Sequence, residues 1–152
     1  MARVSETAWT DAALRALAEG GVAAVRVEAL ARTLGVTKGS FYHHFRRRND
    51  LLMATLSAWE RAATEDIITE TDALPPTERL ARLITTVFAE HPLNDAIESA
   101  IREWAATAPP VQARIAVIDA RRLAYVEGLL RDLGQPEDCL LYTSDAADDL
   151  YR

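Results

Sequence analysis

The sequence predicts an all-α protein, and three observations carry that prediction. Ala, Leu, Arg and Glu dominate the composition, with only 6 Gly and 6 Pro in 152 residues, which favours helices over sheets. Apolar residues recur at spacings of three and four along almost the whole chain. The sequence also has no alternating strand pattern and no evident internal repeat. We therefore expect about seven helices.

Glycine and proline residues set the expected helix boundaries. Gly20-Gly21 and Gly35 end the first two helices, and Pro92 ends the fifth. Thr37 and Asn94 are expected to cap the third and sixth helices with their side chains. The expected helices span residues 4–19, 27–34, 38–45, 49–70, 76–91, 94–106 and 109–133.

Charge is distributed unevenly along the chain. Residues 1–50 contain eight Lys or Arg and five acidic residues, so this part carries about +3. Because the whole chain carries −6, the remainder carries about −9. A basic head on an acidic body suits a polyanionic partner, although a chance imbalance would give the same count.

Several classes of protein are excluded or disfavoured. No apolar run is long enough to span a bilayer, and residues 1–11 lack the continuous apolar stretch of a signal peptide, so a cytoplasmic protein is expected. The single cysteine, Cys139, rules out an internal disulfide framework.

No enzyme signature is present in the sequence. There is no glycine-rich phosphate loop, nucleophile elbow or His-Glu metal helix. Glu98 and Glu103 are five residues apart and fall on different helix faces. His43 and His44 point about 100° apart on a helix, and the only other histidine, His91, is distant in the sequence. We expect no catalytic residues, no cofactor and no metal site.

The informative segment is residues 27–52, VEALARTLGVTKGSFYHHFRRRNDLL. It predicts two short helices around a tight turn at Gly35, where glycine permits a positive φ. Phe41 and Phe45, four residues apart, anchor the second helix in the core. Small residues at the start of that helix let its backbone approach DNA closely, and a helix N-terminus is a good phosphate partner. The pattern favours a helix-turn-helix whose second helix enters the major groove.

This segment resembles the TetR family of transcriptional regulators over roughly the first 55 residues. The residues that carry the resemblance are Ala31, Gly35-Val36, Lys38-Gly39, Phe41-Tyr42, His44-Phe45 and Leu51. The resemblance implies a DNA-binding head at 1–50 and a helical ligand-binding and dimerisation domain at 51–138. It implies a homodimer that binds double-stranded operator DNA, responds to an unknown small-molecule effector and represses transcription. The alternatives are a helical small-molecule-binding or interaction module without DNA binding, and a helical enzyme.

The resemblance also implies roles for individual residues. Positions that read bases or the adjacent backbone in the family are Thr37, Lys38, Gly39, Ser40 and His43. Tyr42, His44 and Arg48 occupy positions that contact phosphates, which place the protein on DNA without specifying sequence.

Two positions depart from the family pattern. Arg26 stands where a Ser or Thr usually caps the second helix, so that cap is expected to be missing. Glu28 stands where an Arg or another DNA-facing group is common. An acid there could accept from a cytosine amino group, but a solvated side chain is the favoured interpretation.

A ligand pocket is expected between the fourth and seventh helices. Its candidate residues are Trp59, Phe88, His91, Trp104, Arg121 and Tyr125. Pockets of this kind are mostly apolar with a few polar anchors, and ordinary core packing is the alternative for each residue.

Residues 139–149, CLLYTSDAADD, do not share the composition of the preceding chain, which is rich in Ala, Arg and Leu. They resemble the translation of a transposon-derived sequencing adapter, and a genuine short C-terminal segment is the alternative. The segment 139–152 is therefore expected not to be native, and the domain at 51–138 to be C-terminally truncated. A chain ending this way is expected to form at best a weak or non-native dimer.

Overall fold

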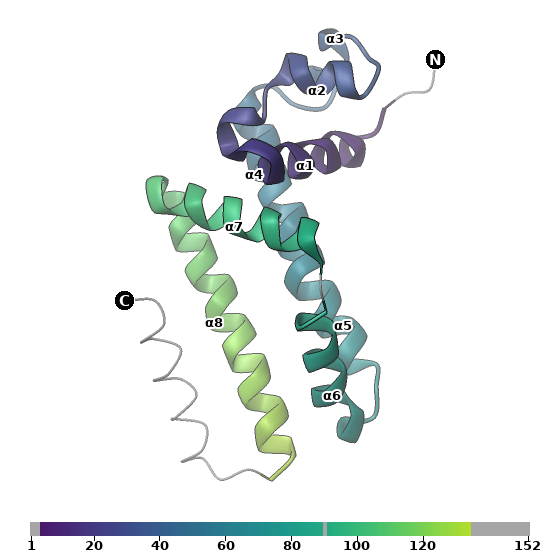
Figure 1. Cartoon of the computed structure of the whole chain (residues 1–152), viewed down its shortest axis with the longest axis vertical. Helices are drawn as coiled ribbons and strands as arrows, with labels where there is room; N and C mark the ends of the chain where they lie inside the picture. Colours follow the sequence, from purple (N-terminus) through teal and green to yellow (C-terminus); the bar gives the residue numbers. More distant parts are fainter. Residues whose placement is uncertain (1–3, 90, 135–152) are drawn as a thin grey trace. The chain divides into compact units, whose positions relative to one another are not determined.

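The computed structural model describes residues 4–89 and 91–134, and within them every regular element is helical. The elements are α1 (Glu6–Ala24), α2 (Val27–Thr33), α3 (Lys38–Phe41), α4 (Arg48–Glu60), a π-helical turn (Arg61–Glu65), α5 (Asp66–Asp72), α6 (Pro76–Val87), α7 (Pro92–Thr107) and α8 (Pro109–Asp132) (Figure 1). The predicted all-α class is confirmed. The predicted long fourth helix is α4, the π turn and α5 in continuous succession. The expectations for residues 139–152 lie outside the described residues.

Helix α1 begins at Glu6, directly after a capping serine. Ser5 is its N-cap, and the Ser5 hydroxyl accepts a hydrogen bond from the Ala8 N–H at 3.2 Å. Helical dihedrals stop at Gly20 and Gly21, with a φ of +63° at Gly21, so the predicted break is present. One further helical turn follows, and α1 ends at Ala24 rather than at residue 19.

Two other predicted boundaries are wrong. Helix α6 ends at Val87, four residues earlier than expected. Helix α7 begins at Pro92, so Asn94 lies inside the helix and does not cap it. Proline suits the first helical position because the N–H that it lacks would have no partner there. Pro92 therefore starts a helix instead of only ending the previous one.

The first compact unit comprises Met1–Ala62 and Glu90–Ile115. In it, α7 and α4 pack against α1, and α2 packs against α3. Its core is apolar and holds Trp9, Leu17, Val25, Phe41, Leu51, Leu56 and Ile101, all fully buried. This core carries the short helices α2 and α3, which could not persist alone.

The second unit comprises Ala63–Ala89 and Ala116–Arg152, of which residues 63–89 and 116–134 are described. Here α5 packs against α6, and side chains of α8 bind the π turn. The Arg122 guanidinium donates to the Thr64 hydroxyl at 2.9 Å and to the Ala63 carbonyl at 3.2 Å. A π turn displaces backbone groups from the usual helical ladder. Arg122 thus supplies partners where that ladder is interrupted.

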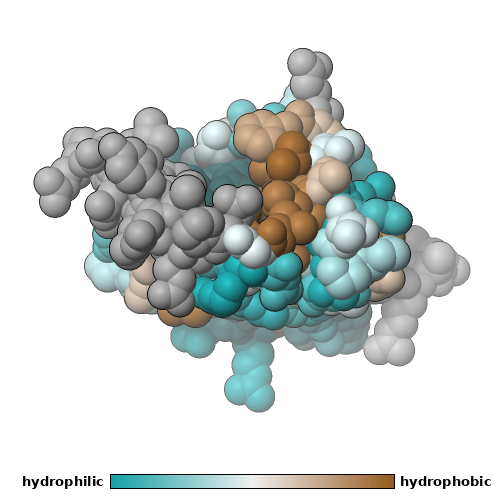
Figure 2. Space-filling model, turned by 90° about the horizontal axis from the view of Figure 1, so that it is seen from below, coloured by the Kyte–Doolittle hydropathy of each residue, from teal (hydrophilic) through white to brown (hydrophobic). Residues whose placement is uncertain are grey.

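Apolar side chains are exposed along one face of α6. Ile84, Val87 and Phe88 follow a helical spacing, and Phe88 exposes 79% of its surface. Figure 2 shows apolar surface bordered by polar surface on the face that it presents. None of the described helices is long and apolar enough to cross a membrane.

Candidate nucleic-acid interface

The turn between α2 and α3 is built on Gly35, which has a φ of +66°. The Val36 N–H donates to the Ala31 carbonyl at 2.9 Å, and the Gly35 N–H donates to the Arg32 carbonyl at 3.1 Å. This pair of bonds is a Schellman motif, which needs a left-handed residue after the helix. The predicted role of Gly35 is confirmed, and the turn fixes the direction in which α3 leaves α2.

Two phenylalanines hold α3 in place, as predicted. Phe41 is fully buried, and its ring packs in a T-shaped arrangement with the Trp9 ring, with centroids 5.4 Å apart. Phe45 is also buried, 5.4 Å from Phe41. The helix itself is only Lys38–Phe41, because a hydrogen-bonded turn replaces the predicted second half. The Phe45 N–H still donates to the Phe41 carbonyl at 3.0 Å, so both rings reach the core.

The start of α3 and the turn after it present a polar surface. Thr37, Lys38, Gly39 and His43 are exposed, Tyr42 exposes 58% of its surface, and Ser40 is half-buried. Thr37 occupies the N-cap position, but its side chain makes no capping hydrogen bond. The prediction of a side-chain cap is therefore wrong, and the Thr37 hydroxyl remains available at the surface.

Gly39 is not required by the fold. A Cβ added there would meet only the Thr37 hydroxyl at 3.6 Å, an ordinary contact, and its φ is not positive. Alanine would also favour the helix. The absence of a side chain therefore leaves backbone exposed at the start of α3 without serving the internal packing.

His44 and Arg48 bind the backbone of the head itself. His44 Nε2 donates to the Val4 carbonyl at 2.8 Å, which fixes the hydrogen on that nitrogen. The Arg48 guanidinium donates to the Val25 carbonyl at 2.6 Å and also to the Val22 carbonyl. Neither bond could be read from helical periodicity, because the partners are 23 to 40 residues away.

Glu28 and Lys38 form an ion pair across α2 and α3. The Lys38 Nζ and Glu28 Oε1 lie 2.5 Å apart. The hydrogen bond from Lys38 lowers the pKa of Glu28, and the bond to Glu28 raises the pKa of Lys38. Glu28 is 61% exposed, in agreement with the favoured interpretation of a solvated side chain, and the ion pair with Lys38 adds a contact that this interpretation did not include. The only sequence signal was the opposite charge of two residues on adjacent short helices. Arg26, by contrast, makes no side-chain cap, as predicted.

The basic cluster at the start of α4 is partly paired. Arg46 and Arg47 are exposed, and the Arg47 guanidinium lies 3.6 Å from the Asp50 carboxylate. The Arg47 N–H also donates to Asp50 at 3.0 Å, which anchors the first turn of α4. An acid in the first turn of a helix is favourable for the helix dipole.

The six predicted pocket residues fall in two units. Trp59, His91 and Trp104 belong to the first unit, and Phe88, Arg121 and Tyr125 to the second. Trp59 is buried and His91 is exposed. Arg121 lies 2.8 Å from the Glu65 carboxylate, and the Tyr125 hydroxyl donates to Asp72 at 2.9 Å. The shared ligand pocket remains a prediction.

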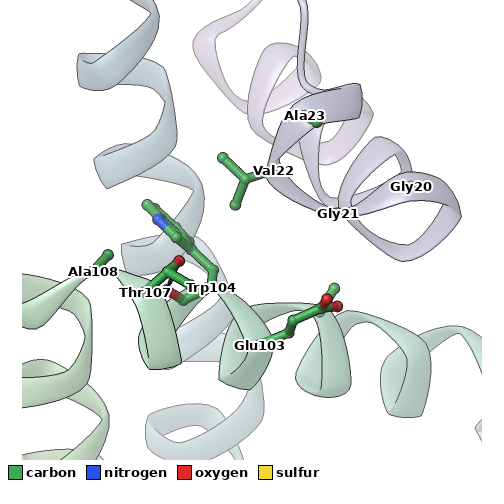
Figure 3. Close-up of a pocket in the computed structure, with 9 residues that line it drawn as sticks. Gly20, Gly21, Val22, Ala23, Glu103, Trp104, Thr107 and Ala108 are labelled. Atoms are coloured by element: carbon green, nitrogen blue, oxygen red, sulfur yellow. Dashed lines mark hydrogen bonds between the residues drawn. The ribbon is translucent and has the colours of Figure 1, made fainter.

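A cleft of about 490 Å³ lies within the first unit, beside Trp104 (Figure 3). Gly20-Gly21, Val22 and Ala23 line it from α1, and Glu103, Trp104 and Thr107 line it from α7. Of the six predicted pocket residues, only Trp104 lines this cleft. Among the described residues, no group of three His, Cys, Asp or Glu is placed to hold a metal ion.

The turn at Gly35, the anchored helix α3 and its polar surface define a helix-turn-helix domain. Residues 10–55 match the family model described as "Bacterial regulatory proteins, tetR family". This part of the chain is a helix-turn-helix domain of the tetR family, as the resemblance of its motif predicted.

Curated relatives extend the similarity beyond this domain. The chain is 31% identical over 129 residues to the HTH-type transcriptional regulator BetI of Rhizobium meliloti (strain 1021), covering 81% of this chain and 62% of that protein. It is 30% identical over 118 residues to BetI of Escherichia coli O17:K52:H18, covering 74% and 60%. The chain thus spans about three fifths of the length of these relatives. No solved structure gives a significant match.

Proposed function

We propose that this chain is a transcriptional regulator that reads double-stranded operator DNA through α3. One observation carries the proposal. A short helix, fixed by the Gly35 turn and by Phe41, presents a polar surface of Thr37, Lys38 and Gly39 at its N-terminus. A recognition helix needs this arrangement, because its first residues contact base edges in the major groove.

The exposed groups divide by the contacts that they can make. Lys38 and Ser40 offer hydrogen-bond donors toward base edges, and the bare backbone at Gly39 permits close approach. His43 is exposed in the turn that follows α3. The exposed Tyr42 hydroxyl can donate to a phosphate, which positions the domain without reading sequence.

The rest of the chain completes the proposed regulator. Residues 1–50 form the DNA-binding domain, and residues 51–138 belong to a helical domain for effector binding and dimerisation. The protein acts as a cytoplasmic homodimer, represses transcription and releases DNA when a small molecule binds. It catalyses no reaction. The curated relatives, both named as transcriptional regulators, support this proposal.

Selection of bound duplexes from a random-sequence pool is the direct test, followed by affinity measurements on the selected operator. Gly39→Ala should weaken operator binding at least tenfold, because a methyl group obstructs the approach to DNA. The variant should unfold at the same denaturant concentration or slightly higher, since the fold accommodates that methyl group.

Gly128→Ala is the matched control, because Gly128 lies in α8 and a Cβ there meets nothing within 4 Å. This variant should bind the operator as the unaltered chain does. Selection that enriches no sequence, or Gly39→Ala binding that equals the control, would count against DNA reading through α3.

A further inference from the structure

The ion pair between Glu28 and Lys38 lies on the surface that the proposed function places against DNA. Glu28 is in the first turn of α2, and Lys38 is the first residue of α3. Both side chains are exposed, Lys38 by 50% and Glu28 by 61%, although their charged atoms are 2.5 Å apart. The pair therefore forms without burial, on a surface open to a partner.

This pairing changes the charge that α3 offers to a phosphate. Lys38 is a compact cation with three donor hydrogens, and Glu28 already occupies one of them. The Glu28 carboxylate also stands beside Lys38 and repels phosphate oxygens. The mutual hydrogen bond lowers the pKa of Glu28 and raises that of Lys38, so both groups are charged at neutral pH.

We propose that Glu28 is a positioning residue that withholds Lys38 from non-cognate DNA and thereby sets the specificity of the domain. On a non-cognate duplex, Lys38 remains with Glu28 and adds no phosphate contact. On a cognate duplex, a base-edge acceptor such as guanine O6 or N7 draws the ammonium group away. Exposed ion pairs are weak, so this exchange is readily reversed. The inference rests on the proposed function.

The test is a salt titration of binding to a mixed-sequence duplex that lacks the selected operator. Each phosphate contact adds about 0.9 to the slope of log affinity against log salt concentration. Glu28→Gln should make that slope steeper by about one and raise the non-cognate affinity several-fold at low salt.

The double variant Glu28→Gln/Lys38→Gln should return to the slope of the unaltered chain. Glu19→Gln is the matched control, because it also removes one exposed acid. Glu19 lies in α1, distant from Lys38 in the sequence, so the salt slope of this variant should equal that of the unaltered chain. Thermal unfolding of each variant verifies that the head remains folded.

Two results would overturn the inference, and they differ from each other. If Glu28→Gln leaves the non-cognate slope unchanged, Glu28 does not withhold Lys38 from phosphates, and the proposed function stands without this inference. If the unaltered chain binds neither the mixed-sequence duplex nor any selected operator, the proposed function fails and the inference fails with it.

Discussion

At the scale of single residues, the head separates side chains that face solvent from side chains that bind its own backbone. Tyr42 and His43 are exposed, whereas His44 and Arg48 donate hydrogen bonds to carbonyls of Val4, Val22 and Val25, although Arg48 is exposed as well. All four residues are adjacent or nearly so in the sequence, and all four were expected to contact DNA. A substitution at His44 or Arg48 therefore tests internal structure as well as DNA binding.

Arg48 provides the sharper test of this distinction. Arg48→Ala removes two charge-assisted hydrogen bonds that tie the start of α4 to the segment joining α1 and α2. Bonds to charged groups contribute about 1.5–3 kcal/mol, so we expect the free energy of unfolding to fall by about 2 kcal/mol. Denaturant unfolding of the variant measures this loss.

Arg46→Ala serves as the control for Arg48, because Arg46 belongs to the same basic cluster and is exposed. Its free energy of unfolding should change by no more than about 0.5 kcal/mol. Unchanged stability of Arg48→Ala together with weakened DNA binding would assign Arg48 to phosphates alone.

At the scale of elements, the Gly35 turn links α2 to α3 through its backbone conformation rather than through packing. A Cβ at Gly35 would meet nothing within 4 Å, but the φ of +66° is unfavourable for alanine. Gly35→Ala should therefore lower the free energy of unfolding by about 1–2 kcal/mol. Thermal or denaturant unfolding measures the change.

Gly128→Ala isolates the conformational cause, since Gly128 has equal space and no positive φ. Inside α8, alanine should raise stability by up to about 1 kcal/mol. If both variants change stability in the same direction, backbone conformation at Gly35 is not what governs the turn.

Sequence patterns predicted the features of the helices correctly where the residues that determine them lie close together in the chain. The spacing of Phe41 and Phe45, the glycine breaks at Gly20-Gly21 and Gly35, and the missing cap at Arg26 all follow from residues within one or two turns. The π turn at 61–65 was not foreseeable in this way. The Ala63 carbonyl of this turn finds a partner on α8, where Arg122 lies 59 residues further along the chain.

Prediction of the candidate site from sequence is limited in the same way, to features set by residues that are close together in the chain. Periodicity indicated which residues of α3 turn away from the core, and the structure places Lys38, Gly39 and His43 at the surface. It could not indicate that Lys38 binds Glu28, because this contact depends on the angle between two short helices. Nor could it show that α3 stops at Phe41, since a turn and a helix place Phe45 similarly.

At the scale of the whole molecule, the modest charge of the head limits what one copy can achieve. Residues 1–50 carry only about +3 within a chain of net charge −6, and the Glu28–Lys38 pair contributes no net charge to that sum. Phosphate neutralisation supplies most of the non-specific affinity of DNA-binding proteins. One head alone should therefore bind duplex DNA weakly at physiological salt.

Tight binding is thus expected only when two heads engage one palindromic operator. For helix-turn-helix dimers, half-sites recur one helical turn apart, about 34–36 Å, or at multiples of that distance. Removing one half-site should lower affinity by at least about 100-fold and roughly halve the salt slope, because half of the phosphate contacts are lost. Inserting about five base pairs between the half-sites should weaken binding comparably, since it rotates one half-site to the opposite side of the duplex. Fluorescence anisotropy with the three duplexes, alongside sedimentation of the free protein, measures both effects. Equal affinity for the palindrome and the single half-site would show that one head suffices, and the proposal of a DNA-bound homodimer would then fail.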